Sequence, residues 1–347
     1  MEWFDLTVKD VKKVTKEATS VTLSIPDSIK NSFSWQPGQH IQLELTIDGE
    51  RTRRCYSISS TWGQALTFTV KKIQGGKAST YINERLKADD LIKVTAPKGR
   101  FTLTPNSETR RSYYFFAAGS GITPIYSMLT TLLPNEPDSF AYLLYSNKDS
   151  KSTIFAEELV HLQKKYSDRL IIKHCHSSPG WFDDAPWRKG RIDTDAVHAF
   201  INECPPYAQD AQYYLCGPGS FIPDLKKALN EIDVPNTRIH MESFGGAKTP
   251  EKPTGDKAIL NVNFNGEKHQ IPVASNQSLL RAMLAEGIEA PYSCEGGVCG
   301  TCRCFLTKGE VSMQNNLVLD ETDIKKGIIL ACQAIPQSKD IEIKYKT

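Results

Sequence analysis

The features of a membrane or exported protein are missing from this sequence of 347 residues. No stretch approaches the roughly 18 uninterrupted apolar residues that a membrane helix needs. The longest apolar passage, near Tyr113 to Ile122, is broken by glycine and serine. The first ten residues, M-E-W-F-D-L-T-V-K-D, have neither the basic nor the apolar region of a secretion signal. We therefore expect a cytoplasmic protein with no membrane span.

An excess of charge of one sign is also missing. The chain has 42 basic and 40 acidic residues, a net charge of +2, which is too small to imply a nucleic acid partner. Its apolar share of 39% and charged share of 24% are those of a globular protein. The length fits two or three domains.

Cysteine, by contrast, is present nine times. An odd number spread over a long chain argues against a disulfide framework. Four cysteines crowd into eleven positions and a fifth follows, and such a cluster in a reducing compartment usually indicates a metal site. These five are Cys294, Cys299, Cys302, Cys304 and Cys332.

The first third of the chain, to about Asn106, has the pattern of an antiparallel barrel. Runs such as Val21 to Ile25, His40 to Ile47 and Leu66 to Ile73 alternate apolar and polar residues, and turn sequences separate them. One helical passage, S-T-Y-I-N-E-R-L, interrupts the strands, with Ser79 as its expected N-cap.

The second part, from about Ser112, alternates apolar strands with helices. Y-Y-F-F-A-A, F-A-Y-L-L-Y-S, R-L-I-I-K-H-C and Q-Y-Y-L-C-G are the expected strands, each followed by a helical segment. This alternation predicts an α/β doubly wound parallel sheet.

A linker is expected after the second part, where glycine, proline and charged residues replace apolar periodicity. About ninety residues with five of the cysteines follow it. The sequence thus predicts a multidomain chain with a barrel over 1–107, an α/β domain over 108–245, a linker over 246–256 and a cysteine-rich domain over 257–347.

The cysteine-rich domain carries the most specific motif. Cys294, Cys299 and Cys302 are spaced C-x4-C-x2-C, and Cys332 follows 29 residues after Cys302. This is the plant-type ferredoxin spacing for a 2Fe–2S cluster, which needs four thiolates, three of them from one tight loop. Glycines in that loop supply the positive φ angles that such wrapping requires.

These cysteines could also form a structural zinc site or remain unligated. A structural zinc site usually has paired ligands at short spacing, and a second such pair is missing here. Unligated cysteines are the other alternative. Cys304 alternates with Cys302 along one strand, so we expect it to be a packed free thiol and not a ligand.

The barrel contains two short motifs that could bind a phosphate and a ring. R-C-Y-S closes a strand, so Arg54 could add charge to a phosphate, Tyr56 could stack on a ring and Ser57 could hydrogen-bond it. G-G-K-A-S opens the helix, and a glycine turn at a helix N-terminus favours phosphate. Arg54 could equally be a surface residue beside a buried tyrosine. The candidate residues are Arg54, Cys55, Tyr56, Ser57, Gly76, Lys77, Ala78 and Ser79.

The α/β domain has two candidate nucleotide-binding turns. G-S-G-I-T-P follows the first strand and begins the first helix, where glycines allow close approach of a dinucleotide pyrophosphate. It lacks the third glycine of the full motif. C-G-P ends the fourth strand, where open α/β sheets place their ligands. Cys216 taken alone is more often a buried core thiol. The candidates are Gly119, Gly121, Thr123, Pro124, Cys216, Gly217 and Pro218.

Together and in this order, these motifs resemble the ferredoxin–NADP reductase superfamily over residues 1–245. The last ninety residues resemble a plant-type ferredoxin with the β-grasp fold. In layout the chain is similar to the reductase components of phenylacetyl-CoA epoxidase, acyl-CoA desaturase and hybrid cluster protein systems. Ala88-Asp89-Asp90 departs from the family's frequent Gly-Asp turn.

The resemblance implies FAD, a 2Fe–2S cluster and NAD(P)H as electron donor. It assigns R-C-Y-S and G-K-A-S to the flavin, G-S-G-I-T-P and C-G-P to the nicotinamide, and Glu242 and Phe244 to the flavin side. Ser57 would support the flavin N5, Cys216 would lie near the nicotinamide C4, and Glu242 would polarise the site.

The predicted function is electron transfer from NAD(P)H through FAD and the cluster to a partner oxygenase, epoxidase or desaturase. A flavin is needed because a hydride carries two electrons and the cluster accepts one. The alternatives are the reductase of a hybrid cluster protein or other redox acceptor, a free-flavin reductase, or a cluster-binding redox sensor without turnover.

The motifs leave two choices open: FAD or FMN as the flavin, and NADPH or NADH as the nicotinamide. FAD is favoured over FMN by the family layout alone. For the nicotinamide, Lys148 and Lys151 follow the second strand and Ser177 and Ser178 the third, all suited to a 2′-phosphate, whereas Asp149 competes. These lysines could simply be solvated. We expect a slight preference for NADPH, with use of both nucleotides.

Overall fold

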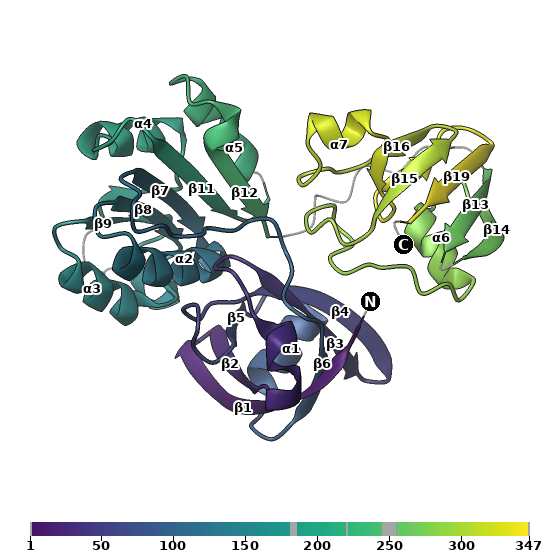
Figure 1. Ribbon diagram of the computed structural model, residues 1–347, viewed down its shortest axis with the longest axis horizontal. Coiled ribbons are helices and arrows are strands. Elements are labelled where there is room, and N and C mark those ends of the chain that lie inside the picture. Colours follow the sequence, from purple (N-terminus) through teal and green to yellow (C-terminus); the bar gives the residue numbers. More distant parts are fainter. Residues whose placement is uncertain are drawn as a thin grey trace. The chain divides into compact units, whose positions relative to one another are not determined.

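The structure is a computed structural model that describes residues 2–180, 186–219, 221–244, 255, 257–264 and 266–345. The chain forms two compact units, Glu2–Phe244 and Gly245–Thr347 (Figure 1). Apart from Gly255, the predicted linker 246–256 lies outside the described residues. The predicted domain boundaries stay predictions.

The larger unit begins with an antiparallel barrel, which confirms the predicted fold. Its strands lie in the order β4-β3-β6-β1-β2-β5, and a bridge between Ile58 and Phe68 joins the two ends of this order. Leu43, Leu45 and Ile47 alternate with more exposed residues along β3 and fill the barrel. The strands are β1 (Phe4–Thr15), β2 (Ala18–Ser24), β3 (His40–Ile47), β4 (Glu50–Ser57), β5 (Thr67–Lys71) and β6 (Leu91–Val94).

Two helical details of the barrel differ from prediction. Helix α1 (Lys77–Glu84) has Gly76 as its N-cap, so the assignment of Ser79 is wrong. The Ser79 hydroxyl donates to the Gly76 carbonyl (3.1 Å) and accepts from the Ile73 N–H (3.2 Å), so it closes the preceding turn instead. A second helical segment, the 3-10 helix η1 (Asp27–Phe33), also forms. It buries only Phe33 and therefore leaves no helical periodicity in the sequence.

The second half of the larger unit is the predicted parallel sheet, in the order β10-β9-β8-β7-β11-β12. The chain moves outward from the central β7 in one direction and then returns to β11 on its other side. This reversal creates a crevice at the carboxyl ends of β7 and β11. The strands are β7 (Ser112–Ala118), β8 (Phe140–Asn147), β9 (Leu170–His176), β10 (Arg188–Lys189), β11 (Ala211–Gly217) and β12 (Ile239–Ser243).

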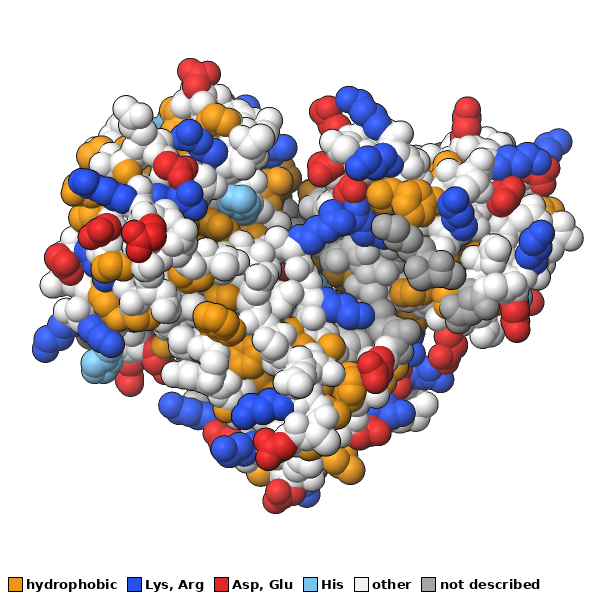
Figure 2. Space-filling view, viewed as in Figure 1, with side chains coloured by type: hydrophobic (Ala, Val, Ile, Leu, Met, Phe, Trp, Pro, Cys, Tyr) orange, Lys and Arg blue, Asp and Glu red, His pale blue; other side chains and the backbone are white. Residues whose placement is uncertain are grey.

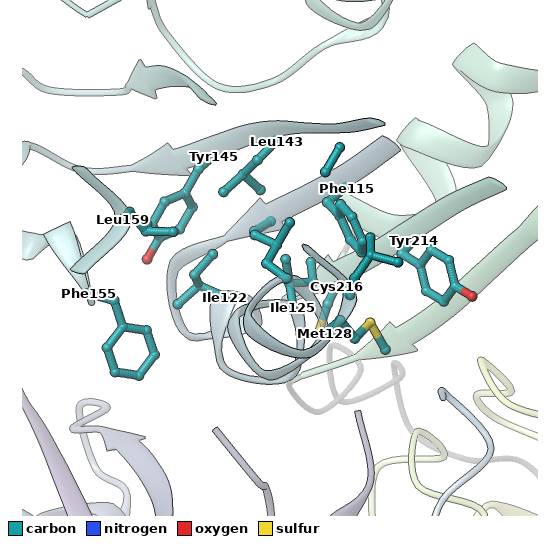
Figure 3. Close-up of a cluster of buried hydrophobic side chains, with 14 of the residues drawn as sticks. Phe115, Ile122, Ile125, Met128, Leu143, Tyr145, Phe155, Leu159, Tyr214 and Cys216 are labelled. Atoms are coloured by element: carbon teal, nitrogen blue, oxygen red, sulfur yellow. The ribbon is translucent and has the colours of Figure 1, made fainter. Parts of the chain in front are cut away.

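Helices cover both faces of this sheet because successive residues of β7 point to opposite sides. Tyr113 and Phe115 pack with α2 and α3, whereas Tyr114 and Phe116 pack with α4 and α5. Figure 3 shows the first of these cores, where Phe115 and Leu143 from the sheet meet helix α2. The helices are α2 (Ile122–Asn135), α3 (Ala156–Lys165), α4 (Thr194–Glu203) and α5 (Phe221–Asn230).

The smaller unit is a β-grasp domain. Its mixed sheet has the order β14-β13-β19-β15-β17, with β13 and β19 parallel at its centre. Ser278 caps helix α6, and Gly287 follows the helix with a positive φ of 75°. The elements are β13 (Ala258–Phe264), β14 (Glu267–Val273), α6 (Leu279–Ala285), β15 (Arg303–Lys308), β16 (Val311–Met313), α7 (Glu321–Lys325), β17 (Ile328–Leu330), β18 (Ala334–Pro336) and β19 (Asp340–Lys344).

The surface carries charge of both signs. Figure 2 shows basic and acidic side chains interspersed over the visible face, as the small net charge leads us to expect. Within the described ranges, each helix is too short or too polar to cross a membrane.

Candidate active site and cluster site

The crevice of the parallel sheet is lined by the two predicted glycine turns. A side chain on Gly121 would place its Cβ 2.0 Å from the Cys216 carbonyl oxygen and 2.8 Å from the Gly217 nitrogen. The turn before α2 and the end of β11 therefore touch backbone to backbone, which only glycine permits. Thr123 donates to the Ser120 carbonyl (3.0 Å) and holds the turn. Gly121, in the turn that also holds Gly119, Thr123 and Pro124, thus meets Gly217.

A lysine from the barrel reaches the same turn. Lys71 is the last residue of β5, and its ammonium lies 3.7 Å from the position that a Cβ on Gly119 would take. A cation beside a glycine turn at a helix N-terminus suits the pyrophosphate of a dinucleotide. Sequence reasoning missed Lys71, because no local pattern distinguishes it from its neighbour Lys72.

The three predicted catalytic residues come together between the barrel and the sheet. Ser57, at the end of β4, donates from its hydroxyl to Glu242 Oε2 (3.2 Å). Glu242 on β12 is paired in register with Cys216 on β11. Ser57 is 3% exposed and Cys216 is fully buried. Burial, with a smaller contribution from Glu242, raises the pKa of the Cys216 thiol well above its ordinary value, so this thiol is neutral.

His40 is a fourth member of this group that sequence reasoning missed. It pairs with Ser57 across β3 and β4, and its Nδ1 lies 3.7 Å from Glu242 Oε1. The two carboxylate oxygens of Glu242 thus face two side chains of the barrel. The G-Q-H sequence that holds His40 indicates only the start of a strand.

Phe244 lies close to this group through its backbone. Its N–H donates to the Gly217 carbonyl (2.8 Å), and its half-buried ring packs against the core of Figure 3. Pro218 follows Gly217 and is exposed.

The remaining flavin candidates lie along β4 and at the start of α1. The Tyr56 ring stacks on Phe68 with centroids 5.8 Å apart, and burial raises the Tyr56 pKa although Arg54 lowers it. Arg54 is exposed and donates to the Arg53 carbonyl (2.7 Å). Cys55 is half-buried.

The turn at α1 is held by its own residues. A Cβ on Gly76 would lie 2.5 Å from both Ile73 Cγ1 and the Ser79 hydroxyl, so the turn closes tightly there. Ala78 and Ser79 are buried, and Lys77 forms an ion pair with Glu50. A tight glycine turn at a helix N-terminus can bind a phosphate. The Ser79 hydroxyl bonds the backbone of this turn and so holds its shape.

The loops after β8 and β9 are joined to each other. The Ser177 N–H donates to the Asn147 carbonyl (2.9 Å), and the Ser178 N–H donates to the Lys148 carbonyl (2.8 Å). The Asp149 carboxylate is occupied as an N-cap, accepting from the Ser152 N–H (2.9 Å). The backbone of Lys148 therefore lies beside that of Ser178, and the 2′-phosphate hypothesis stays a prediction.

The structure also adds cations to this edge of the sheet. No arginine follows H-S-S-P directly, but β10 brings Arg188 and Lys189 alongside β9, opposite Cys175 and His176. The Arg188 guanidinium is 3.5 Å from Asp193, whereas the Lys189 side chain is exposed. These residues lie too far along the chain for a local motif to reveal them.

The four predicted cluster ligands form two pairs. The Cys294 thiol is hydrogen-bonded with Cys299, and the Cys302 thiol with Cys332. Over the described residues, no three side chains of His, Cys, Asp or Glu are grouped as a site for a single metal ion. A 2Fe–2S cluster needs two thiolates on each of two irons, so two pairs fit it better than they fit a single zinc ion.

The loop around these cysteines turns its backbone toward the sulfurs. The Gly296 N–H donates to Cys294 Sγ (3.4 Å), and the Gly297 N–H is hydrogen-bonded to Cys332. Gly297 and Gly300 have positive φ angles of 76° and 68°. N–H groups aimed at sulfur stabilise thiolates, so the loop fits an iron–sulfur cluster.

Cys304 lies outside both pairs. It is 2% exposed, and burial together with Cys332 raises the pKa of its thiol to about 12. All nine cysteines are free of disulfide bonds.

Comparison with known proteins identifies all three domains. An oxidoreductase FAD-binding domain model matches residues 5–103, an oxidoreductase NAD-binding domain model matches 115–227, and a 2Fe–2S iron–sulfur cluster binding domain model matches 262–337. These matches agree with the predicted cofactors FAD, NAD(P)H and a 2Fe–2S cluster.

Full-length relatives share this domain order. The chain is 33% identical to one subunit of the 1,2-phenylacetyl-CoA epoxidase of Escherichia coli (strain K12), over 98% of this chain and 97% of the relative. It is 34% identical to the ferredoxin reductase component of 3-ketosteroid-9-alpha-monooxygenase of Rhodococcus rhodochrous, over 98% and 96%.

Among solved structures, phthalate dioxygenase reductase has the same fold. It superposes with a TM-score of 0.64 at 22% identity, covering 99% of this chain and 98% of the reductase. The chain is therefore an NAD(P)H-dependent oxidoreductase with FAD and a 2Fe–2S cluster, and it belongs to the family of ferredoxin reductase components that carry all three domains in one polypeptide.

Proposed function

We propose that this protein is the reductase component of an oxygenase system and delivers electrons one at a time to a separate oxygenase protein. The observation that supports it most is the convergence of Ser57, Cys216 and Glu242 beside the nucleotide crevice, on a chain that also has a cluster domain. A bound flavin supplies the chemistry that the chain lacks, because it accepts a hydride and releases its electrons singly.

The chain's own residues orient the reacting rings and exclude water. Ser57 presents a hydroxyl fixed by Glu242, and we assign it to the flavin N5. The neutral thiol of Cys216 lies under the crevice, where it can pack against the nicotinamide without introducing a charge. Glu242 holds Ser57 and His40 in place and stabilises positive charge at the oxidised nicotinamide.

The remaining candidates bind the cofactors' phosphates and rings. We assign Arg54, Cys55 and Tyr56 to the flavin together with the Gly76–Ser79 turn, and Phe244 to the flavin side. We assign Gly119, Gly121, Thr123, Pro124, Gly217 and Pro218 to the nicotinamide nucleotide, with Lys71 at its pyrophosphate.

For the cluster, we assign Cys294, Cys299, Cys302 and Cys332 as ligands and leave Cys304 a free thiol. The pairing of the four thiols supports this assignment. Single replacement by serine is the test. The visible absorption of the cluster should be lost or altered at four positions only. Loss of the cluster in the Cys304 variant and its survival in the Cys332 variant would contradict the assignment.

NADPH is the proposed donor, with NADH as a slower substitute. Lys148, Ser177 and Ser178 offer a cation and hydroxyl donors, and Lys189 lies at the same edge. Asp149, the competing acid, is engaged in a cap. A charge-assisted contact contributes about 1.5–3 kcal/mol, which is roughly tenfold to a hundredfold in selectivity. A preference for NADH above tenfold in kcat/KM would refute this proposal.

The proposed acceptor is an oxygenase because the two relatives compared above serve an epoxidase and a monooxygenase. The sequence predicts an oxygenase, epoxidase or desaturase as the partner. The alternatives are the reductase of a hybrid cluster protein or other redox acceptor, a free-flavin reductase, and a sensor without turnover. We place the protein in the cytoplasm because a thiol-rich cluster site suits a reducing compartment.

The test is anaerobic mixing of the holoprotein with NADPH, followed by addition of a purified oxygenase component. We expect bleaching of the flavin, an EPR signal from the reduced cluster, and substrate oxidation once the oxygenase and dioxygen are present. Cluster reduction without transfer to any oxygenase would refute the proposed partner, and a lack of nicotinamide-dependent reduction would favour a sensor.

A further inference from the structure

The buried hydroxyl of Tyr345, in the smaller unit, has no hydrogen-bond partner among the described residues. Tyr345 directly follows β19, and its ring packs edge-on against Phe264 with centroids 5.4 Å apart. An unpaired buried hydroxyl costs about 1–3 kcal/mol. Such a group in a native protein is explained by strain, by a functional role, or by a water molecule or ion that completes its hydrogen bond.

The register of the sheet places Tyr345 beside the predicted cluster ligands. Lys344 on β19 lies opposite Phe305 on the antiparallel β15, so the next step of this register brings Tyr345 opposite Cys304. Side chains opposite each other share one face of a sheet. The neighbouring pair on this face, Leu306 and Ile343, packs into the core of the unit.

The residues on this face of the sheet continue toward the loop that contains the proposed cluster ligands. Cys302 is two residues before Cys304, and successive alternate residues share a face. Both thiols are 2% exposed, and Tyr345 packs against the core that contains them and Cys332. A phenol keeps its proton near neutral pH, so the Tyr345 hydroxyl can donate a hydrogen bond.

Two groups could accept a hydrogen bond from the Tyr345 hydroxyl: the Cys304 thiol and the sulfur atoms of a bound cluster. They differ in their strength as acceptors. Cys304 is 2% exposed, and the sulfur of a thiol is a weak acceptor. The sulfur atoms of a 2Fe–2S centre are negatively charged, and hydrogen bonds to charged acceptors are about twice as strong as those between neutral groups. The stronger acceptor is therefore the cluster.

We propose that the Tyr345 hydroxyl donates a hydrogen bond to a sulfur atom of the 2Fe–2S centre on the side of Cys302 and Cys332, and thereby raises the reduction potential of the cluster. The inference rests on the ligand set proposed above. Reduction adds one electron, supplied by the reduced flavin, and no proton moves. Because the added charge is negative, a donor on the sulfur stabilises the reduced form more than the oxidised form.

The experiment is a redox titration of the holoprotein and of its Tyr345→Phe variant, followed by EPR. Phenylalanine keeps the ring and removes only the hydroxyl. We expect the equilibrium for reduction to weaken three- to tenfold, which moves the potential about 30 to 60 mV more negative. Resonance Raman spectra in H₂O and D₂O should show an isotope shift of an Fe–S stretching band that disappears in the variant. An unchanged potential with an unchanged isotope shift overturns the proposal.

Two further variants separate the alternatives. Cys304→Ala tests the other acceptor: the effect of Tyr345→Phe should be as large in this background as in the native chain, and its disappearance there would overturn the proposal. Phe264→Leu removes the ring contact but keeps the hydroxyl, so the potential should stay near the native value. Equal shifts in the Phe264 and Tyr345 variants would assign the effect to packing and also overturn it.

Failure of this inference about Tyr345 can be told apart from failure of the proposed function by two further measurements. Iron and sulfide analysis of the native protein tests whether the cluster is present, without reference to Tyr345. Reduction of ferricyanide by NADPH in the same samples reports on the flavin site. A native protein with full cluster content and full ferricyanide activity, whose potential does not depend on Tyr345, would refute only the inference about this residue.

Discussion

The geometry of the proposed hydride-transfer site depends on one side chain, Glu242. One carboxylate oxygen accepts from Ser57 and the other lies 3.7 Å from His40, so the two contacts hold both the carboxylate and its partners in position. The Glu242 side chain is 14% exposed. In such a poorly hydrated place a negative charge acts strongly on the positive charge that develops on the nicotinamide.

We therefore predict that Glu242→Gln slows reduction of the flavin by NADPH. The amide oxygen of glutamine can still accept from Ser57, so the variant removes mainly the charge. The rate should fall about tenfold or more, with the KM for NADPH within about threefold of native. Stopped-flow absorbance measures this rate. Glu231→Gln, an exposed glutamate on the surface, serves as the control, and equal rates in the two variants would contradict the role of Glu242.

At the scale of elements, the nucleotide crevice depends on how closely the turn before α2 approaches β11. Gly121 has φ −60° and ψ −13°, which any residue can adopt. Its requirement for glycine is steric, because a Cβ would overlap the Cys216 carbonyl and the Gly217 nitrogen. Both obstacles are backbone atoms and cannot rotate away.

Gly121→Ala should consequently push the turn away from β11. We expect a loss of about 1–3 kcal/mol in the free energy of unfolding, as for other overpacked sites, together with a higher KM for NADPH. Chemical denaturation and steady-state kinetics measure the two effects. Ser120→Ala changes the neighbouring residue of the same turn without adding volume, so it should stay close to native in both. A Gly121→Ala variant with native stability would show that the turn can relax.

The elements were more predictable than the contacts between them. The barrel strands and the βα units follow from local periodicity and turn sequences, so the sequence alone predicts their order. The prediction of Ser79 as the N-cap is wrong because a serine at the start of a helical run looks the same in sequence whether it caps the helix or supports the preceding turn. His40 and Lys71 could not be found, since their roles arise from packing: Ser57 and Glu242, which His40 joins, are 185 positions apart.

At the scale of the whole molecule, the two kinds of chemistry are assigned to different units. The residues proposed for hydride transfer lie in Glu2–Phe244, and those proposed for the cluster lie in the smaller unit. Each unit has its own hydrophobic cores, so loss of the cluster need not disturb the flavin site. We therefore expect that a substitution can abolish one-electron delivery by the cluster and leave two-electron reduction of the flavin intact.

Replacement of Cys332 by serine tests that separation. The variant removes one thiolate of the Cys302 pair, so the EPR signal of the reduced cluster should be lost or altered and electron delivery to an oxygenase should fall. Reduction of ferricyanide by NADPH should stay within about twofold of native, because the residues proposed for hydride transfer belong to the larger unit, which has its own hydrophobic cores. Flavin content, measured by absorbance of the released cofactor, controls for damage to the larger unit. Cys304→Ser, which alters a buried thiol of the same core but no proposed ligand, should keep both activities. If ferricyanide reduction fell with cluster content while flavin content stayed native, the flavin site would depend on the cluster domain, and the two units would have to act as one.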